Sequence, residues 1–387
     1  MGRTGNAVWF LRMGALILVV SSASCGDDVT RHPQAARFVR TVAASSAIEA
    51  VLEDPPERDA SLVAALRSPE AGITVGALDE PAMLQFGSVE GAARDRWGKL
   101  FVLDGQALEL RVFDDGTASA RPAGRVRVVG GAGLGPGEFQ APLALSMAGG
   151  DAVVAVFESN GRVSLFENSR EDVVYSRLVQ LRMDVDDGCL LDDMLVVAGW
   201  HPEHAGSIHL FTFEGEWIRS FGAFYDSDNP AVVEMLARTN VACLDAGGIV
   251  SAPVLLPEVR RYAPSGELLW LTELNGLSPV YVGEYSHGGV EAGTPEEGYH
   301  GTIGAAAYDA ADLLLVQIAF VHRGDPPPGE EDGPLTYAID LQTGEGALVA
   351  RDILRVLDLS DAGAVLSRRL PFPTVELIDW PGPALRP

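Results

Sequence analysis

The sequence predicts an all-β protein, a six-bladed β-propeller of four-stranded antiparallel blades, preceded by an N-terminal signal and tether segment. Short strands bounded by glycine and aspartate turns recur from about residue 81, with a period of roughly 40–65 residues that is typical of propeller blades. Runs such as LFVL, AVVAVF and DLLLVQIAF are apolar throughout, which indicates strands buried on both faces. Blades stacked radially around a common axis bury both faces of every sheet.

The composition indicates a folded, acidic protein. The chain has 387 residues, of which 47% are hydrophobic, so it can form a sizeable core. Its 54 acidic and 28 basic residues give a formal net charge of −26. Such a surface repels phosphate backbones, because nucleic-acid affinity comes mainly from cationic side chains that neutralise phosphates. We therefore expect no nucleic-acid partner.

Residues 1–24 are predicted to form a signal peptide. Arg3 and Arg12 precede the apolar run MGALILVV (13–20). This run is shorter than the roughly 20 residues that a membrane-spanning helix needs, and it suits the hydrophobic region of a signal peptide.

The residues that follow indicate a lipid anchor. SSASC places small residues before Cys25, which resembles the lipobox of bacterial lipoproteins, with Ser22 where leucine is usual. The resemblance implies cleavage before Cys25 and lipidation of its thiol and new amino group. Two or more acyl chains make such anchoring stable. An ordinary secretory signal ending near SSAS, which would release a soluble protein, is the alternative.

Residues 25–80 are predicted to form a tether with a short helix and a closing strand. AARFVRTVAASSAIEAVLE (35–53) has the apolar spacing of a helix, and DPPERD (54–59) ends it. GITVGAL (72–78) is the strand expected to complete the last blade, which would join the two ends of the chain.

The predicted propeller occupies residues 81–387. Each repeat reads as a turn, an apolar strand, a loop and a second strand, with compositions that suit antiparallel sheets. The six repeats lie at 97–116, 149–169, 192–217, 247–271, 311–320 with 334–346, and 361–380.

The glycine-rich stretch GGAGLGPGEF (130–139) is not predicted to bind phosphate. A Walker-type loop needs G-x-x-x-x-G-K-[ST], and neither the Lys nor the Ser or Thr follows here. A dinucleotide fingerprint opens a helix, but Pro136 and Pro142 interrupt any helix at this point. The stretch is instead predicted to be a wide loop between blades, with Phe139 packing back into the core.

The same stretch carries a family resemblance. GGAGLGPGEFQAP (130–142) resembles the signature that opens NHL-type repeats, and GKLFVLDGQALELRVFDDG (98–116) resembles the rest of such a repeat, with Asp104 after the first strand and Phe113 ending the second. The whole resembles six-bladed β-propeller lipoproteins of bacteria, a family without a well-defined activity. The resemblance covers roughly residues 81–380 and is specific in the first two blades.

Cys189 and Cys243 occupy matching positions, each shortly before a strand core. Export permits a disulfide, but a bridge requires Cα atoms about 4.4–6.8 Å apart. Equivalent points on neighbouring repeats are expected to be farther apart. The sequence therefore predicts two buried thiols that act as small hydrophobic residues, with a disulfide as the alternative.

The candidate site is one end of the ring. If the strands of a blade run A to D from the axis outward, the B–C loops and the inter-blade loops share that end. The presumed B strands end at Asp104, Glu158, His201 with His204, and His322, which are therefore candidate ligand-binding residues. His201, His204 and His322 are also candidate ligands of Zn²⁺ or a similar ion. Imidazoles of His201 and His322 more than about 8 Å apart could not share one ion.

The expected function is that of a binding or interaction module without catalysis or a cofactor. Its partner would be an envelope protein, a peptide, a glycan or a small ligand. The expected location is the cell envelope, with the domain facing the periplasm. A glycine directly after Cys25 favours the outer membrane. The alternative is a metal-dependent hydrolase or lactonase that uses Zn²⁺ or Ca²⁺ at the end of the propeller channel.

Overall fold

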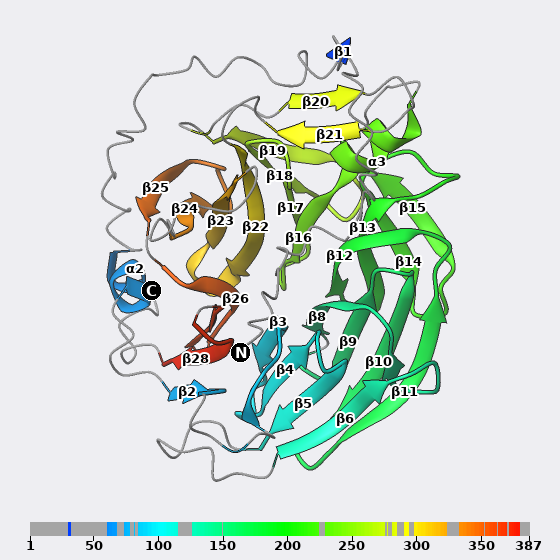
Figure 1. Cartoon of the computed structure of the whole chain (residues 1–387), viewed down its shortest axis with the longest axis vertical. Helices are drawn as coiled ribbons and strands as arrows, with labels where there is room; N and C mark the ends of the chain where they lie inside the picture. The colour runs from blue at the N-terminus through cyan, green and yellow to red at the C-terminus, as the bar shows by residue number, and fades with distance from the viewer. Residues whose placement is uncertain are drawn as a thin grey trace, which may run out of the picture.

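Six blades, each with four antiparallel strands, surround a common axis in the computed structural model (Figure 1), which confirms the predicted fold. The structure describes residues 30–31, 60–67, 73–77, 81, 84–114, 126–148, 150–223, 229–274, 277, 281–284, 290–293, 298–322, 333–351, 353–361, 363–369 and 371–379.

The first strand of each blade, strand A, lies next to the axis, and the following strands pair outward in sequence order. The A strands are β3 (Val89–Arg94), β8 (Pro142–Ala148), β12 (Asp184–Leu191), β16 (Thr239–Cys243), β22 (Gly298–Tyr308) and β26 (Arg355–Ser360). The B strands are β4 (Leu100–Asp104), β9 (Val153–Glu158), β13 (Met194–Trp200), β17 (Ile249–Pro253), β23 (Leu313–His322) and β27 (Gly363–Arg368). The C strands are β5 (Glu109–Phe113), β10 (Arg162–Asn168), β14 (Ile208–Thr212), β18 (Glu258–Tyr262), β24 (Leu335–Asp340) and β28 (Thr374–Ile378). The D strands are β6 (Val126–Ala132), β11 (Val173–Gln180), β15 (Trp217–Phe221), β19 (Leu268–Glu273), β25 (Gly346–Ala350) and β2 (Ile73–Val75).

The core lies between neighbouring blades. In β4, Phe101 packs with Val154 of the second blade, whereas Leu100 packs with Val365 of the sixth. Successive side chains of a strand point to opposite faces, so one apolar run contributes to two separate interfaces. This confirms the burial on both faces that the continuous apolar runs predict.

The ring is closed by an N-terminal strand, as the sequence predicts. β2 pairs antiparallel with β28, with Ile73 opposite Leu377 and Val75 opposite Val375. The last blade therefore combines strands from both ends of the chain.

The segment before β2 also contributes to the folded body. Helix α2 (Ala60–Arg67) buries Val63 and Leu66 in the cluster that joins the fifth and sixth blades. These residues of the predicted tether are thus packed against the ring. The helix predicted at 35–53 lies outside the described residues, as does Cys25.

The glycine-rich stretch connects the first two blades, as predicted. Its short strand β7 (Glu138–Phe139) pairs parallel with the end of β6, and Phe139 is fully buried. A Cβ on Gly130 would lie 2.3 Å from the Phe139 ring, so only glycine lets the ring pack there. Gly137 has φ +74°, which other residues rarely adopt.

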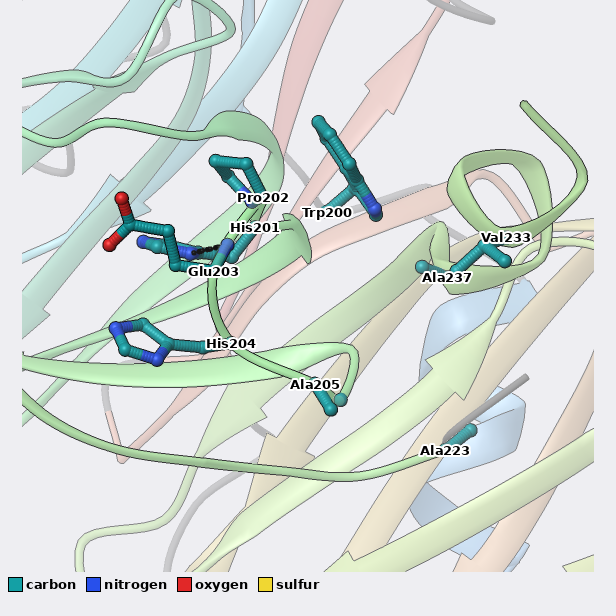
Figure 2. Close-up of a pocket in the computed structure, with 10 residues that line it drawn as sticks. Trp200, His201, Pro202, Glu203, His204, Ala205, Ala223, Val233 and Ala237 are labelled. Carbon is teal, nitrogen blue, oxygen red and sulfur yellow. Dashed lines mark hydrogen bonds between the residues drawn. The ribbon is translucent and has the colours of Figure 1, made fainter. Parts of the chain in front are cut away.

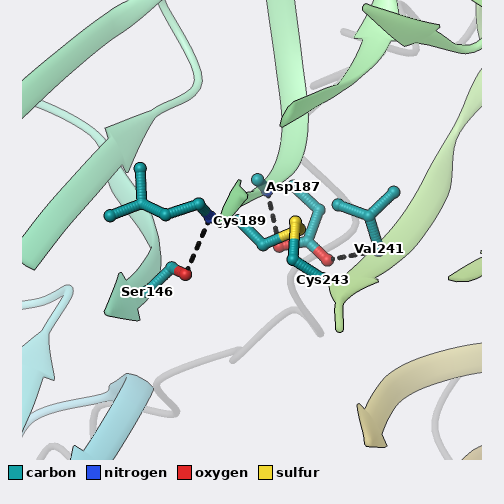
Figure 3. Close-up of a disulfide and its surroundings, with 7 residues drawn as sticks. Ser146, Asp187, Cys189, Val241 and Cys243 are labelled. Atoms are coloured by element: carbon teal, nitrogen blue, oxygen red, sulfur yellow. Dashed lines mark hydrogen bonds between the residues drawn. A yellow bond between two sulfur atoms is a disulfide. The ribbon is translucent and has the colours of Figure 1, made fainter. Parts of the chain in front are cut away.

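The prediction of two free thiols is wrong, because Cys189 and Cys243 form a disulfide with a Cα–Cα distance of 5.7 Å (Figure 3). Both cysteines lie on A strands, β12 and β16. Equivalent positions on outer strands diverge, but A strands converge around the axis and bring these positions within bridging distance. The Asp187 carboxylate accepts a hydrogen bond from the Val241 N–H at 2.9 Å beside the bridge.

Further elements lie in the connections between blades. Helix α3 (Pro230–Ala237) connects the third blade to the fourth. Strands β20 (Tyr281–Glu284) and β21 (Val290–Gly293) connect the fourth to the fifth and form a small sheet with β1 (Thr30–Arg31). No helix within the described ranges has the length and apolarity needed to cross a membrane.

Candidate functional site

Helix α3 is fixed over the end of the third blade by its first turn and its apolar face. Asn229 caps the helix by accepting a hydrogen bond from the Ala231 N–H at 3.0 Å, and Pro230 occupies the first turn, where its fixed φ favours a helix. Val232 and Leu236 are buried in a cluster with Leu256 after β17. The helix therefore forms a fixed wall at the end of the ring where strand β13 finishes.

A pocket of about 230 Å³ lies between this helix and the loop that joins β13 to β14 (Figure 2). The loop contributes residues 200–206, and Ala223, Val233 and Ala237 form the other side. The pocket thus combines a B–C loop with an inter-blade connection, the two kinds of segment that the sequence predicts to share one end.

A row of aromatic rings runs along the loop side of this pocket. The ring centroids of His201 and His204 lie 4.4 Å apart, and His204 stacks on Trp217 at 4.0 Å with an interplanar angle of 14°. On the other side, the His209 ring lies 5.4 Å from His201. The loop side of the pocket is therefore held by ring contacts that reach from the interior of the blade to the exposed indole of Trp217.

The hydrogen bonds of His209 fix its tautomer. Its Nε2 lies 3.2 Å from the Gly199 carbonyl oxygen, which can only accept, so Nε2 carries the proton. Its Nδ1 therefore accepts from the Ser220 hydroxyl at 2.6 Å, and the Trp217 indole N–H donates to that hydroxyl oxygen at 2.9 Å. This relay stabilises the neutral imidazole.

Burial also holds these histidines neutral. The pKa of His209 is lowered to about 4, mainly by burial and to a smaller extent by the neighbouring imidazoles of His201 and His204, against the bond to the Gly199 carbonyl. Burial and His204 likewise lower the pKa of His201, whose Nδ1 accepts the Glu203 N–H at 3.0 Å. Near neutral pH both rings are therefore uncharged; His201 lines the pocket and His209 lies buried behind it.

We expect His209→Gln to flatten the acid side of the stability profile. The folded-state pKa of about 4 lies below the unfolded value of 6.5, so the unfolded chain binds more protons between these pH values. Stability from neutral His209 is therefore present above pH 6.5 and is lost as the pH falls towards 4, by about 3 kcal/mol. Urea unfolding at several pH values measures this, and parallel profiles for wild type and variant would contradict it.

A charged cluster lies beside the last turn of α3. Arg238 Nε is 3.3 Å from Asp186 Oδ1 on β12. Burial raises the pKa of Asp186 to about 6 even though Arg238 opposes the shift, and burial also raises the pKa of Glu234 on the helix. The end of α3 is thus joined to an A strand by an ion pair whose carboxylate is poorly solvated.

The structure brings together two of the five predicted site residues, His201 and His204. Asp104 and Glu158 are fully buried in the first and second blades, where their carboxylates accept backbone N–H groups. His322 ends β23, opposite Gly298 of β22, and its side chain lies outside the described part of the structure.

Several residues of the pocket and of the ring contacts beside it escape prediction from sequence. Val233 and Ala237 belong to an apolar helix within the connection of the third blade, which the repeat pattern does not mark. His209 and Trp217 lie on strands, where one polar or aromatic residue resembles any other. The N-P dipeptide before PAVVEMLA is the available signal, because Asn at the cap and Pro at the start are typical of a helix.

The orientation of the His201 and His204 imidazoles tests whether the two side chains could bind the same metal ion. The ring planes of His201 and His204 are inclined by 31° with their centroids 4.4 Å apart, so the two rings pack against each other in a tilted arrangement. Lone pairs lie in the ring planes, and rings in this arrangement do not direct them to one point. Within the described ranges, no group of three or more His, Cys, Asp or Glu side chains is arranged to hold an ion. The observed arrangement favours ring stacking over chelation by this pair.

Comparisons with known proteins give distant structural likenesses. No family model and no curated protein matches the sequence. Hydrazine synthase of Kuenenia stuttgartiensis aligns with a TM-score of 0.42 and 13% identity over 75% of this chain and 73% of that one. A DUF4221 member from Bacteroides vulgatus gives 0.49 and 8% over 80% and 96%. U3-55K gives 0.48 and 11% over 76% and 95%. At these values the likenesses carry no argument about function, and the assignment as a propeller is based on the strand pairing.

Proposed function

We propose that this protein is an exported, lipid-anchored binding module that receives its partner at the pocket between the third blade and α3. The propeller fold suggests a binding or interaction role. The pocket is the observation that supports this location: Pro202, Ala205 and Val233 are apolar, and Glu203 and His204 are polar. Small-molecule sites combine such an apolar lining with a few polar groups.

The size of the pocket limits what it can hold. Sites for drug-sized ligands measure roughly 300–1,000 Å³, whereas this pocket measures about 230 Å³. It therefore suits a small molecule or a single side chain of a protein or peptide. A buried anchor side chain of this kind carries much of the binding energy in many interfaces. The proposed ligand is accordingly small, or is one anchor residue of an envelope partner.

We expect Val233→Trp to abolish partner binding without loss of stability. Val233 is only partly buried, so the larger side chain can extend into the pocket and fill it. Isolation of partners from bacterial envelopes with wild type and variant, followed by mass spectrometry, measures the effect. Leu178→Ser, a change on the exposed outer strand β11, is the matched control. Partners retained by Val233→Trp and lost by Leu178→Ser would contradict the proposed site.

The proposed location at the membrane is based on Cys25 and receives support from the disulfide. Bridges such as Cys189–Cys243 are typical of proteins in oxidising compartments. A lipidated Cys25 would hold the propeller at the envelope, with the outer membrane as the preferred site.

We expect Cys25→Ser to release the protein from membranes. The change removes the thiol that would carry lipid. Incorporation of an alkyne-labelled fatty acid and fractionation of envelopes measure the two consequences. A wild-type protein without label, found in the soluble fraction, would instead support the ordinary secretory signal.

The hydrolase alternative would require an ion shared by His201, His204 and His322. Its test is the zinc and calcium content of protein purified without chelator. Stoichiometric metal that is lost in both His201→Ala and His322→Ala would replace the binding module by the enzyme.

A further inference from the structure

Arg355, at the start of β26, lacks a protein partner among the described residues. Its Nε is buried without a hydrogen bond. No described carboxylate oxygen lies within 4.0 Å of its nitrogens, the limit for an ion pair. The residue as a whole remains partly exposed, so its terminal nitrogens can meet a ligand from solvent.

The neighbours of Arg355 place its guanidinium on the axial side of the ring. A Cβ on Gly304 of β22 would lie 3.9 Å from Arg355 Nε. Its charge interacts with the carboxylates of Glu90 on β3 and Asp187 on β12. Blades one and five flank blade six, and blade three lies opposite, so the groups that act on Arg355 belong to A strands around the axis (Figure 1).

Other arginines of the propeller show what a purely structural arginine does here. Arg111 pairs with Glu109 at 2.9 Å, and Arg162 pairs with Glu158 at 3.3 Å. Arg238 pairs with Asp186 at 3.3 Å. Each of these side chains has a counter-ion at contact distance, and Arg355 has none in the part of the chain that the structure describes.

An uncompensated cation in this position works against folding. Burial lowers the pKa of Arg355, because its charged form loses hydration. The carboxylates of Glu90 and Asp187 oppose this shift, and the positive charge of Arg369 adds to it. A charge removed from water without a partner destabilises the fold. Residues that lower stability in this way are typical of functional sites.

We propose that Arg355 binds the carboxylate group of a small ligand on the axis of the propeller. The planar guanidinium presents paired N–H donors that match a carboxylate. The negative charges of Glu90 and Asp187 also act at this position, so a ligand with a single negative charge fits better than phosphate. The inference is independent of the pocket beside α3, because Arg355 is not among its lining residues.

The test is thermal unfolding of the purified protein in acetate, propionate, phosphate or chloride at constant ionic strength. We expect acetate and propionate to raise the Tm of wild type in a saturable way, and phosphate to raise it less. Arg355→Gln should lose this response, with at least about a tenfold loss of affinity, and its Tm in chloride should equal or exceed that of wild type.

Two controls make the result specific. Arg170→Gln, at an exposed arginine after β10 of the second blade, should keep the carboxylate response. Val233→Trp should also keep it, which separates this site from the proposed pocket. If Arg355→Gln does not fold, Arg355→Lys replaces it in the test, since lysine keeps the positive charge and lacks the paired N–H donors. Any of three results would overturn the proposal: an unchanged affinity for carboxylate in the variant that folds, no saturable rise of the Tm in wild type, or a stronger response to phosphate than to acetate.

Discussion

Replacing both Cys189 and Cys243 by serine is expected to lower the free energy of unfolding by about 3–4 kcal/mol. The bridge joins residues 54 apart in sequence, and the closed loop contains the rest of the third blade and helix α3. A cross-link of this span reduces the conformational entropy of the unfolded chain substantially. Urea unfolding of wild type and the double variant measures the difference.

A reducing agent provides the matched control for this prediction. Wild type in dithiothreitol should unfold at the same urea concentration as the double-serine variant, and dithiothreitol should not change the unfolding midpoint of the variant. The hydrogen bond from the Val241 N–H to Asp187 remains in both, so the difference isolates the covalent bridge. Equal midpoints for oxidised wild type and variant would show that the bridge adds nothing to stability.

The error over these cysteines shows what a repeat pattern can predict. Repetition reveals that Cys189 and Cys243 are equivalent, and it reveals the blades in which they lie. It does not reveal how far each strand lies from the axis, and this distance decides whether equivalent positions meet. The closing strand at 72–78 was predictable because the ring needs a partner for β28, which local sequence and closure both indicate.

The candidate site likewise combines residues that the sequence predicts with residues that only the tertiary structure brings together. His201 and His204 were predictable because they are close in sequence and lie in a B–C loop, so their approach needs little tertiary information. The pocket also needs α3, a helix within one inter-blade connection, and its position depends on contacts such as that of Leu236 with Leu256. The row of aromatic side chains beside the pocket also includes His209 and Trp217, which are brought together by the pairing of β14 with β15.

Asp104 and Glu158 show a further limit of prediction from sequence. A carboxylate at the end of a B strand has the same sequence signature whether it binds a ligand or a turn. In the second blade, Glu158 accepts N–H groups from Gln140 and Ala141 and pairs with Arg162. Only the structure shows that these oxygens face the connection that leads into their own blade.

Asp104→Ala is expected to destabilise the propeller by about 3–5 kcal/mol. The Asp104 carboxylate accepts the Gly87 N–H at 3.0 Å and the Ser88 N–H at 3.1 Å, which anchors the chain entering β3. It also accepts the N–H groups of Gln106 and Ala107 in the B–C turn. Alanine would remove the acceptor that these N–H groups share, and each donor that water cannot reach costs about 1–3 kcal/mol.

The loss also removes a counter-ion, because Asp104 Oδ2 lies 3.5 Å from Arg111 Nη2, and Arg111 is itself buried. Asp104→Asn is the informative second variant. Its amide nitrogen can only donate and would face either N–H donors or the guanidinium, so we expect this variant to lose most of the stability that Asp104→Ala loses.

Asp379→Ala is the matched control, since it breaks an ion pair with Arg94 at 2.7 Å whose carboxylate is largely exposed, and it should cost less than about 1 kcal/mol. If Asp104→Ala instead kept its stability and lost only partner binding, the carboxylate would be a ligand-binding group, and the structural role argued from its hydrogen bonds would be wrong.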